Sequence, residues 1–286
     1  MTNQLSIGVA GWSYPDWQKI VYPAGVKDPL AYLCRFVDCI EINSTFYRPP
    51  EGRICQTWLS KTKDKPEFFF AAKLHQDFTH EYQLNSSLIR DFHDGLHPLL
   101  ETGRLRHLLM QFPYYFDDSP KNRNHLTELV NRFSPPFNLV VEVRHQSWEA
   151  ADAMDFLTRL QVSVATIDYP IGPDSFSLPC CTVGKAGYFR LHGRNTEAWF
   201  KASSRDEKYN YCYSTDELKQ IEARIKSLCR AFASVMVITN NHYQGSAVAN
   251  ALELKARLTG QKQLVPEDLF LRYPGLKEIA LNPPLF

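Results

Sequence analysis

The stretch Asn138-Leu139-Val140-Val141-Glu142-Val143-Arg144 is an apolar run that ends in two charged residues placed two positions apart. In a β-strand, residues i and i+2 point to the same face, so Glu142 and Arg144 would project together where the run stops. Four further apolar runs end in the same way, with Glu41 and Asn43, Lys73 and His75, Thr166 and Asp168, and Arg190 and His192. Such endings predict a parallel sheet whose carboxyl ends share one polar site.

Eight runs with β-strand composition lie along the chain, at about residues 5–11, 38–43, 67–74, 107–112, 138–144, 162–168, 187–192 and 234–240. Apolar residues with helical spacing lie between most of them, at 28–37, 86–101, 119–133, 148–160, 214–232 and 246–258. Strands that alternate with helices are typical of βαβ units. Eight such units predict an α/β protein with a closed TIM-type (β/α)₈ barrel. The alternative is an open doubly wound sheet, which the lack of a Gly-rich loop after the first strand disfavours.

Two connections depart from the regular pattern. Segment 169–186 contains three prolines and is predicted to form an irregular sixth crossover. The long, polar and aromatic segment 193–213 is predicted to form an extended loop over the barrel mouth after the seventh strand. Ser214 and Glu217 have the spacing of a capping box at the start of the next helix. We expect residues 1–286 to form a single domain on which the tail 263–286 packs.

The composition restricts the class of protein. The 32 basic and 31 acidic residues nearly balance, so no global field attracts nucleic acid or a membrane, although a local basic patch is allowed. The seven cysteines include no CxxC pair, which favours reduced thiols in a cytoplasmic protein. No apolar run approaches the ~20 residues that span a bilayer, and the N-terminus lacks the apolar segment of a signal peptide. The sequence leaves the oligomeric state open.

The chain also carries a series of long motifs. They are Gly11-Trp12-Ser13-Tyr14-Pro15-Asp16-Trp17, Val37-Asp38-Cys39-Ile40-Glu41-Ile42-Asn43-Ser44-Thr45-Phe46-Tyr47, Phe70-Ala71-Ala72-Lys73 with Thr79-His80, Gln111-Phe112-Pro113, Glu142-Val143-Arg144-His145-Gln146-Ser147-Trp148, Arg190-Leu191-His192-Gly193-Arg194-Asn195, Tyr209-Asn210-Tyr211 with Tyr213-Ser214, and Asn240-Asn241. Over about residues 5–258 they resemble the YecE-like proteins, the seventy-second family of unknown function. The pattern departs at Thr239, where an aromatic residue is expected. The resemblance implies a single TIM-type barrel and leaves the reaction open.

In such barrels the catalytic groups sit at the carboxyl ends of the strands. The residues predicted to be catalytic are Glu142, Asp168, His192 and Lys73. The residues predicted to bind the substrate are Glu41, Asn43, Tyr47, His75, Gln111, Arg144, Trp148, Arg190, Asn240, Asn241, Trp12 and Tyr14. The two arginines and Lys73 would bind an anion, because a guanidinium donates to two oxygens at once. Lys73 as a Schiff-base nucleophile is disfavoured, since nearby carboxylates would keep its amine protonated.

These residues predict an enzyme that uses acid–base chemistry on a small anionic substrate, either phosphorylated or sugar-like. Hydrolysis, elimination and isomerisation all fit. The structural alternative is a layer of ion pairs that neutralise each other inside the barrel. Another alternative is a nucleic-acid-binding or processing protein of the metal-dependent endonuclease barrel type, because aromatic and cationic residues crowd the predicted mouth loops. A non-catalytic metabolite sensor is the third.

No cofactor is expected. A divalent metal is conceivable, because carboxylates and histidines end several strands. However, the chain has no HExxH motif, no HxH motif and no cluster of cysteine and histidine. The arginines and Lys73 beside the carboxylates would also repel a cation. A metal is therefore not favoured.

Overall fold

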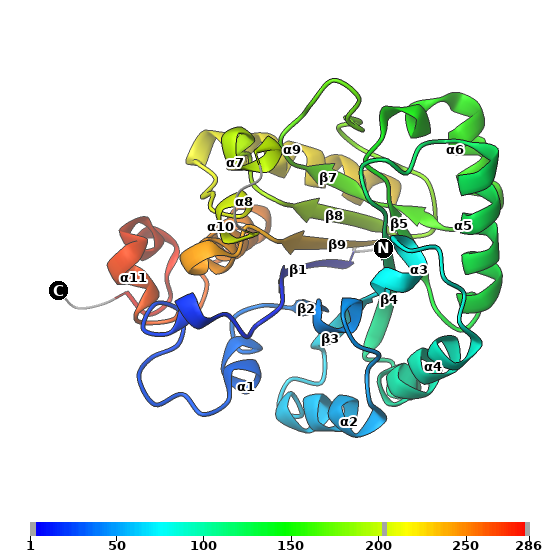
Figure 1. Ribbon diagram of the computed structural model, residues 1–286. Helices are drawn as coiled ribbons and strands as arrows, with labels where there is room; N and C mark the ends of the chain where they lie inside the picture. The colour runs from blue at the N-terminus through cyan, green and yellow to red at the C-terminus, as the bar shows by residue number, and fades with distance from the viewer. Residues whose placement is uncertain (1–3, 202–204, 284–286) are drawn as a thin grey trace.

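The computed structural model describes residues 4–201 and 205–283, and shows parallel strands enclosed by helices (Figure 1). The strands are β1 Gln4–Ala10, β2 Cys39–Ile42, β3 Phe69–Lys73, β4 Leu105–Gln111, β5 Leu139–Glu142, β6 Ser163–Val164, β7 Thr166–Asp168, β8 Gly187–Leu191 and β9 Ser234–Thr239. Every pairing between them is parallel, in the order β6-β5-β4-β3-β2-β1-β9-β8-β7.

The two edge strands, β6 and β7, are pieces of one sixth strand. Only Ala165 separates them, and its N–H still donates to the carbonyl of Val141 at 2.8 Å. Because β6 pairs with β5 and β7 pairs with β8, this broken strand closes the sheet. The predicted eight-unit TIM-type barrel is therefore confirmed, with its sixth strand interrupted at one residue.

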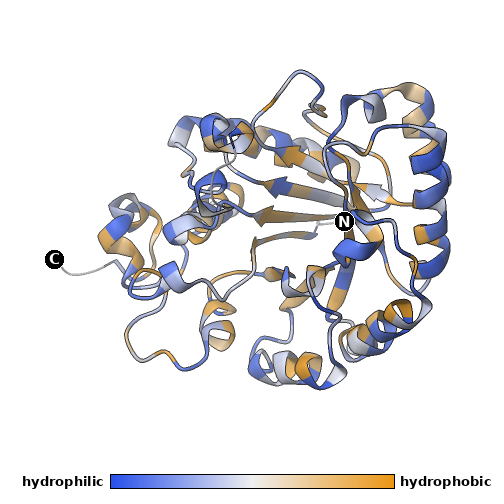
Figure 2. Cartoon of the chain, viewed as in Figure 1, coloured by the Kyte–Doolittle hydropathy of each residue, from blue (hydrophilic) through white to orange (hydrophobic). Residues whose placement is uncertain are grey.

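Helices cover the outside of the barrel. The α-helices are α1 Pro29–Leu33, α2 Gly52–Lys61, α3 Gln76–Thr79, α4 Ser86–Glu101, α5 Pro120–Phe133, α6 Ala151–Arg159, α7 Thr196–Phe200, α8 Arg205–Lys208, α9 Thr215–Ala231, α10 Ser246–Thr259 and α11 Leu269–Arg272. The 3₁₀ turns are η1 Pro15–Trp17, η2 Ser44–Phe46, η3 Gln146–Glu149, η4 Tyr243–Gly245 and η5 Pro274–Ile279. Figure 2 shows hydrophobic residues along the strands and hydrophilic ones on the outer side of α5, as the helical spacing requires.

The connections confirm the two predicted irregularities. No helix forms within 169–186, all of which the structure describes, and the connection after β8 holds only the short helices α7 and α8 in its described part. At α9, Ser214 and Glu217 form the predicted capping box. The helix α2 was not predicted, and of its residues only Cys55 is buried.

The C-terminal tail contacts the start of α10 and the turn before it. The Tyr273 hydroxyl donates to the carbonyl of Gln244 at 2.9 Å and lies 3.0 Å from Ser246 Oγ. Within the tail, Gln263 forms a bridge with Ala280. Among the described residues, no helix is both long enough and apolar enough to cross a membrane.

The strand register determines which residues face the barrel interior, because partners on neighbouring parallel strands share a face. Glu142 pairs with Gln111 and Arg190 pairs with Ile238. The interior therefore receives every second residue of each strand. Lys73 and Glu142, the last residues of β3 and β5, enter it together with Arg190, the second-last residue of β8.

Candidate functional site

Arg190 lies at the centre of the barrel between two carboxylates. Its Nη2 donates to Glu41 Oε1 at 2.7 Å and its Nη1 donates to Glu142 Oε2. Tyr188 donates its hydroxyl hydrogen to the other oxygen of Glu41 at 2.9 Å, and Gln111 Oε1 accepts from Arg190 Nη1 at 3.2 Å. The Arg190 side chain is only 1% exposed, and the carboxylates of Glu41 and Glu142 are fully buried. Both terminal nitrogens of Arg190 are thus occupied inside the protein, and ligand binding by Arg190 stays a prediction.

Glu142 also holds Arg144, which reaches further toward solvent. Arg144 donates to Glu142 Oε1 through Nε at 3.0 Å and through Nη2 at 2.8 Å. Burial alone would raise the pKa of Glu142, but the charges of Arg190 and Arg144 outweigh it and hold that pKa well below its ordinary value. Glu142 thus stays ionised at neutral pH and acts as the counter-ion of two arginines rather than as a proton donor.

His192 lies beside Glu142 and is completely buried. Asn240 Nδ2 is 2.9 Å from His192 Nδ1, so the amide donates and the ring hydrogen sits on Nε2, which is 3.4 Å from Glu142 Oε1. Burial lowers the pKa of His192 to about 4. The imidazole is therefore neutral at physiological pH, and Asn240 selects its tautomer.

Lys73, the last residue of β3, is the exception among these charged groups. Its Nζ lies 3.7 Å from the centroid of the Phe46 ring, and no carboxylate of the described residues forms an ion pair with it. Burial, with a smaller contribution from Arg190, lowers the pKa of Lys73 to about 7. At neutral pH the amine is thus present in both protonation states.

Arg144 and the aromatic residues around it form the described part of the mouth above this cluster. The Arg144 side chain is 14% exposed, and its guanidinium carbon lies 5.5 Å from the Trp199 ring and 6.0 Å from the Tyr169 ring. Trp199 and Tyr209 also approach the His192 ring, with centroids at 5.9 and 6.4 Å. Arg144 is the arginine of the predicted pair that a ligand can reach.

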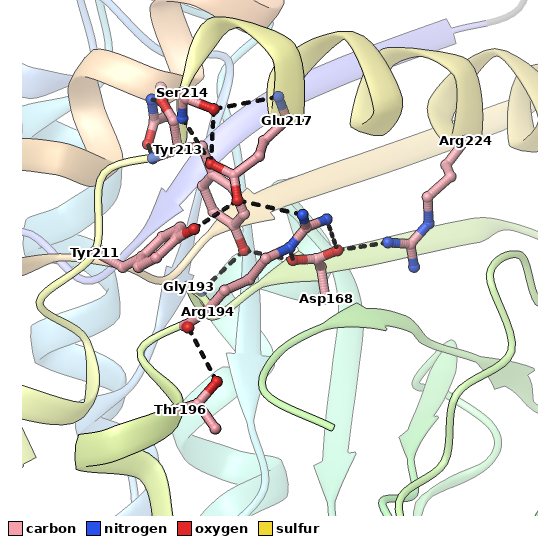
Figure 3. A network of polar contacts seen from close by, with 10 residues as sticks. Asp168, Gly193, Arg194, Thr196, Tyr211, Tyr213, Ser214, Glu217 and Arg224 are labelled. Carbon is pink, nitrogen blue, oxygen red and sulfur yellow. Dashed lines mark hydrogen bonds and ion pairs between the residues drawn. The ribbon is translucent and has the colours of Figure 1, made fainter. Parts of the chain in front are cut away.

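Asp168 does not belong to this cluster, and its catalytic role stays a prediction that this position does not support. Its strand neighbour Ile167 is in register with Arg190, which faces the interior, so Asp168 faces the surrounding helices. There it accepts from Arg194 Nε at 2.9 Å and from Arg224 Nη1 at 2.6 Å (Figure 3). These charges hold the pKa of Asp168 below its ordinary value, although burial acts to raise it.

Asp168 binds residues at both ends of the connection between β8 and α9, Arg194 at its start and Tyr213 at its end (Figure 3). Tyr213, at the far end of the connection, donates to Asp168 Oδ1 at 2.8 Å, and its hydroxyl oxygen accepts from Gly193 N at 2.9 Å. Glu217 in α9 accepts from Arg194 at 3.3 Å and from the Tyr211 hydroxyl at 2.5 Å. Asp168 therefore anchors the connection that carries Trp199 and Tyr209.

The comparisons with known proteins agree with this architecture. Residues 6–270 match the family described as "Protein of unknown function DUF72". The chain belongs to the YecE-like DUF72 family. It is 26% identical over 298 residues to UPF0759 protein YunF of Bacillus subtilis, covering 97% of this chain and 99% of that protein. It is 28% identical to UPF0759 protein YecE of Escherichia coli K12 over 148 residues, which is 51% of this chain and 50% of that protein.

Two solved structures show the same barrel. A DUF72 family protein from Thermotoga maritima MSB8 superposes with a TM-score of 0.79 at 33% identity, covering 90% of this chain and 99% of that one. A DUF72 family protein from Enterococcus faecalis V583 gives a TM-score of 0.77 at 22% identity, covering 90% and 96% of the two chains. This second likeness concerns the fold alone.

Several other residues predicted for the site of this DUF72 protein have structural contacts elsewhere. Asn241 points outward and donates to the carbonyl of Tyr211 at 2.9 Å. The indole of Trp148 is fully buried and donates to the carbonyl of Phe116 at 2.8 Å. His75 caps α3 by accepting from Asp77 N at 3.2 Å. Each of these three side chains has a partner within the fold, and their contact with a substrate stays a prediction.

The remaining predicted residues gather at the ends of β1 and β2. These residues are Trp12, Tyr14, Asn43 and Tyr47. Together with Gly11, Ser13 and Ser44 they line a cavity of about 200 Å³. Tyr14 also stacks on the His242 ring with centroids 4.3 Å apart. Contact of these four residues with a substrate stays a prediction.

Phe46 and His80 are neighbours of Lys73 that the sequence reasoning did not assign to the site. The His80 ring lies 5.1 Å from the Phe46 ring, and burial together with the charge of Lys73 lowers the pKa of His80 to about 4. Both residues lie in motifs that carry the resemblance to the DUF72 family, and these motifs were the sequence feature that could have assigned them to the site.

Among the described residues, no group of three or more metal-ligating side chains could hold a metal ion. The expected absence of a metal and the nuclease alternative stay predictions.

Proposed function

We propose that the protein is an enzyme that binds a small anionic substrate at the carboxyl ends of the strands and transforms it through proton transfer. The observation that carries the proposal is that the buried Lys73 amine has no carboxylate partner among the described residues. Within the described residues, Arg144 and Arg190 are both paired with carboxylates, whereas the Lys73 amine rests on an aromatic ring. A cation without a counter-ion in a buried position is a site for an anion.

The formal charges of the cluster support an anionic ligand. Glu41 and Glu142 carry two negative charges, and the two arginines that bind them balance those charges. Protonated Lys73 adds a positive charge that this cluster leaves unbalanced. A bound anion would stabilise the protonated amine, and Arg144 would supply the guanidinium contact at the mouth. A phosphoryl or carboxylate group on a small, sugar-like molecule has the matching chemistry.

Lys73 is also suited to transfer a proton. A general acid or base works best when its pKa lies near the working pH, and the pKa of Lys73 is lowered to about 7. Glu142 stays ionised beside it and His192 stays neutral, so these two residues provide a fixed electrostatic environment. In this scheme Lys73 moves the proton and Arg144 orients the anionic group.

The test is calorimetric titration with sulfate, whose charge does not change near neutral pH. Anion binding should favour protonated Lys73, so at about pH 8 binding should take up close to one proton, measured by comparing buffers of different ionisation enthalpy. At constant ionic strength the affinity should fall by up to about tenfold per pH unit above pH 7.

Lys73→Met should remove both the proton uptake and most of the affinity. Lys262→Met, which removes an exposed lysine, is the matched control and should leave both unchanged. Sulfate binding by Lys73→Met that equals wild-type binding in strength and pH dependence would overturn the proposal.

A further inference from the structure

We propose that Lys73 is a nucleophile that forms an imine with the aldehyde or ketone carbon of its substrate. The inference rests on the proposed function and specifies its substrate class, a small anionic carbonyl compound. It reverses the expectation that neighbouring carboxylates would keep this amine protonated. The reversal follows from where each carboxylate oxygen in the cluster is bound.

The arginines and Tyr188 take the carboxylate oxygens that could otherwise bind Lys73. Glu41 receives Arg190 on one oxygen and Tyr188 on the other. Glu142 receives Arg190 on one oxygen and Arg144 on the other. The amine of Lys73 therefore has no carboxylate partner among the described residues, and a desolvated lysine of this kind is an activated nucleophile. Its lowered pKa agrees with this geometry.

The backbone around Lys73 holds the amine in place. The Thr45 hydroxyl donates to the carbonyl of Lys73 at 2.6 Å and contacts the carbonyl of Ile42 at 3.1 Å, which ties the end of β3 to η2. The same turn supplies Phe46, whose ring face lies under Nζ. An aromatic face stabilises a cation, so it can stabilise the protonated imine as well as the ammonium.

The reaction balances without an added reagent. The nitrogen lone pair attacks the carbonyl carbon, the new C–N bond forms, and the carbonyl oxygen takes a proton to give a carbinolamine. The nitrogen then loses its proton, the hydroxyl leaves as water after protonation, and a C=N bond replaces the C–O bond. The proton that leaves the nitrogen can be returned to the departing oxygen, so the proton transfers balance within the reaction. Arg144 would hold the anionic group of the substrate.

The experiment is reductive trapping with pyruvate and with dihydroxyacetone phosphate as separate probes. Borohydride delivers hydride to the imine carbon and leaves a stable secondary amine, which intact mass and peptide mapping locate. At pH 7 we expect one adduct per chain on Lys73, formed at least about tenfold faster than on exposed Lys262. Neutral acetone should trap more slowly, and Arg144→Met should remove the preference for the anionic probes.

Peptide mapping locates the adduct in the wild-type protein. The test therefore does not depend on whether Lys73→Met folds. Lys73→Arg, which keeps the charge, should bind sulfate and form no adduct. Adducts spread evenly over the lysines, or none on Lys73 with either probe, overturn the imine. If sulfate binding still depends on Lys73 in that case, the proposed function stands alone. If sulfate binding is also independent of Lys73, both fail.

Discussion

Replacing Glu142 by glutamine separates the electrostatic role of this residue from its shape. The substitution keeps the side-chain size but removes the charge that faces Arg190 and Arg144. Arg190 is only 1% exposed and would retain Glu41 as its single carboxylate, while Arg144 would lose its ion-pair partner. Removing one member of a buried ion pair typically costs ~3–5 kcal/mol, because the remaining charge is left uncompensated.

The expected change in melting temperature follows from the chain length. Unfolding entropy of about 2.1 cal/mol/K per residue gives roughly 0.6 kcal/mol/K for 286 residues, so this loss corresponds to a decrease of roughly 5–8 °C. Thermal unfolding followed by circular dichroism measures it. Glu128→Gln is the matched control, because Glu128 is exposed and its nearest Arg132 nitrogen is 3.9 Å away. We expect it to change stability by less than about 0.5 kcal/mol.

The pH dependence gives an independent check. The pKa of Glu142 is lower in the folded protein than in the unfolded chain, so its stabilisation is complete above about pH 5 and is lost as the pH falls through the folded value. The difference between wild type and Glu142→Gln should therefore be full at neutral pH and shrink in acid. Glu142 also raises the pKa of Lys73, so the variant should lower the pH at which Lys73 becomes half-reactive. A melting temperature unchanged within a degree, with Lys73 reactivity also unchanged, would refute the reasoning.

Further predictions concern Lys73, Asp168 and Gly8. Because the pKa of Lys73 is lower in the folded state, unfolding takes up a proton between about pH 7 and 10, so wild-type stability should rise with pH across this window and that of Lys73→Met should not. Asp168→Ala should cost ~3–5 kcal/mol in urea unfolding, because Arg194 and Arg224 lose their shared carboxylate; a loss below about 1 kcal/mol would contradict it. Gly8→Ala should prevent folding, as judged by soluble yield and circular dichroism, because its Cβ would lie 2.0 Å from the Cys39 carbonyl oxygen. Gly275→Ala meets nothing within 4 Å and is the control.

The sequence predicted which residues share a face but not always which face is inside. Each i and i+2 pair has the same orientation, and for Glu142 with Arg144 this face is the interior. In a TIM-type barrel helices cover the outside, so both faces of a strand are apolar and the pattern does not distinguish them. For this reason the pattern did not show that Asp168 faces the surrounding helices. Asn240 and Asn241 are neighbours in the chain, and only the first reaches His192.

The ion pairs within the site could not be predicted from the sequence, for a different reason. Which carboxylate oxygen binds which cation depends on distances between strands that are far apart in the chain. Arg190 and Glu41, for example, are separated by 149 residues and meet at 2.7 Å. Because these pairings occupy both carboxylates, the Lys73 amine has no ion-pair partner among the described residues, which the sequence alone could not show. The strand order and the eight-unit barrel, by contrast, follow from local patterns repeated along the chain.

Asp168 holds both ends of the connection between β8 and α9, so this connection is attached to the barrel as one separate unit. Gly193 and Tyr213 are joined directly at the base, so the residues between them form a closed loop whose length hardly affects the barrel. Changes within that loop should alter which molecules enter while leaving the charged cluster below intact. We therefore expect that loops of this kind can be exchanged between related barrels as single units, which makes the segment from Gly193 to Tyr213 the natural place to graft a new specificity.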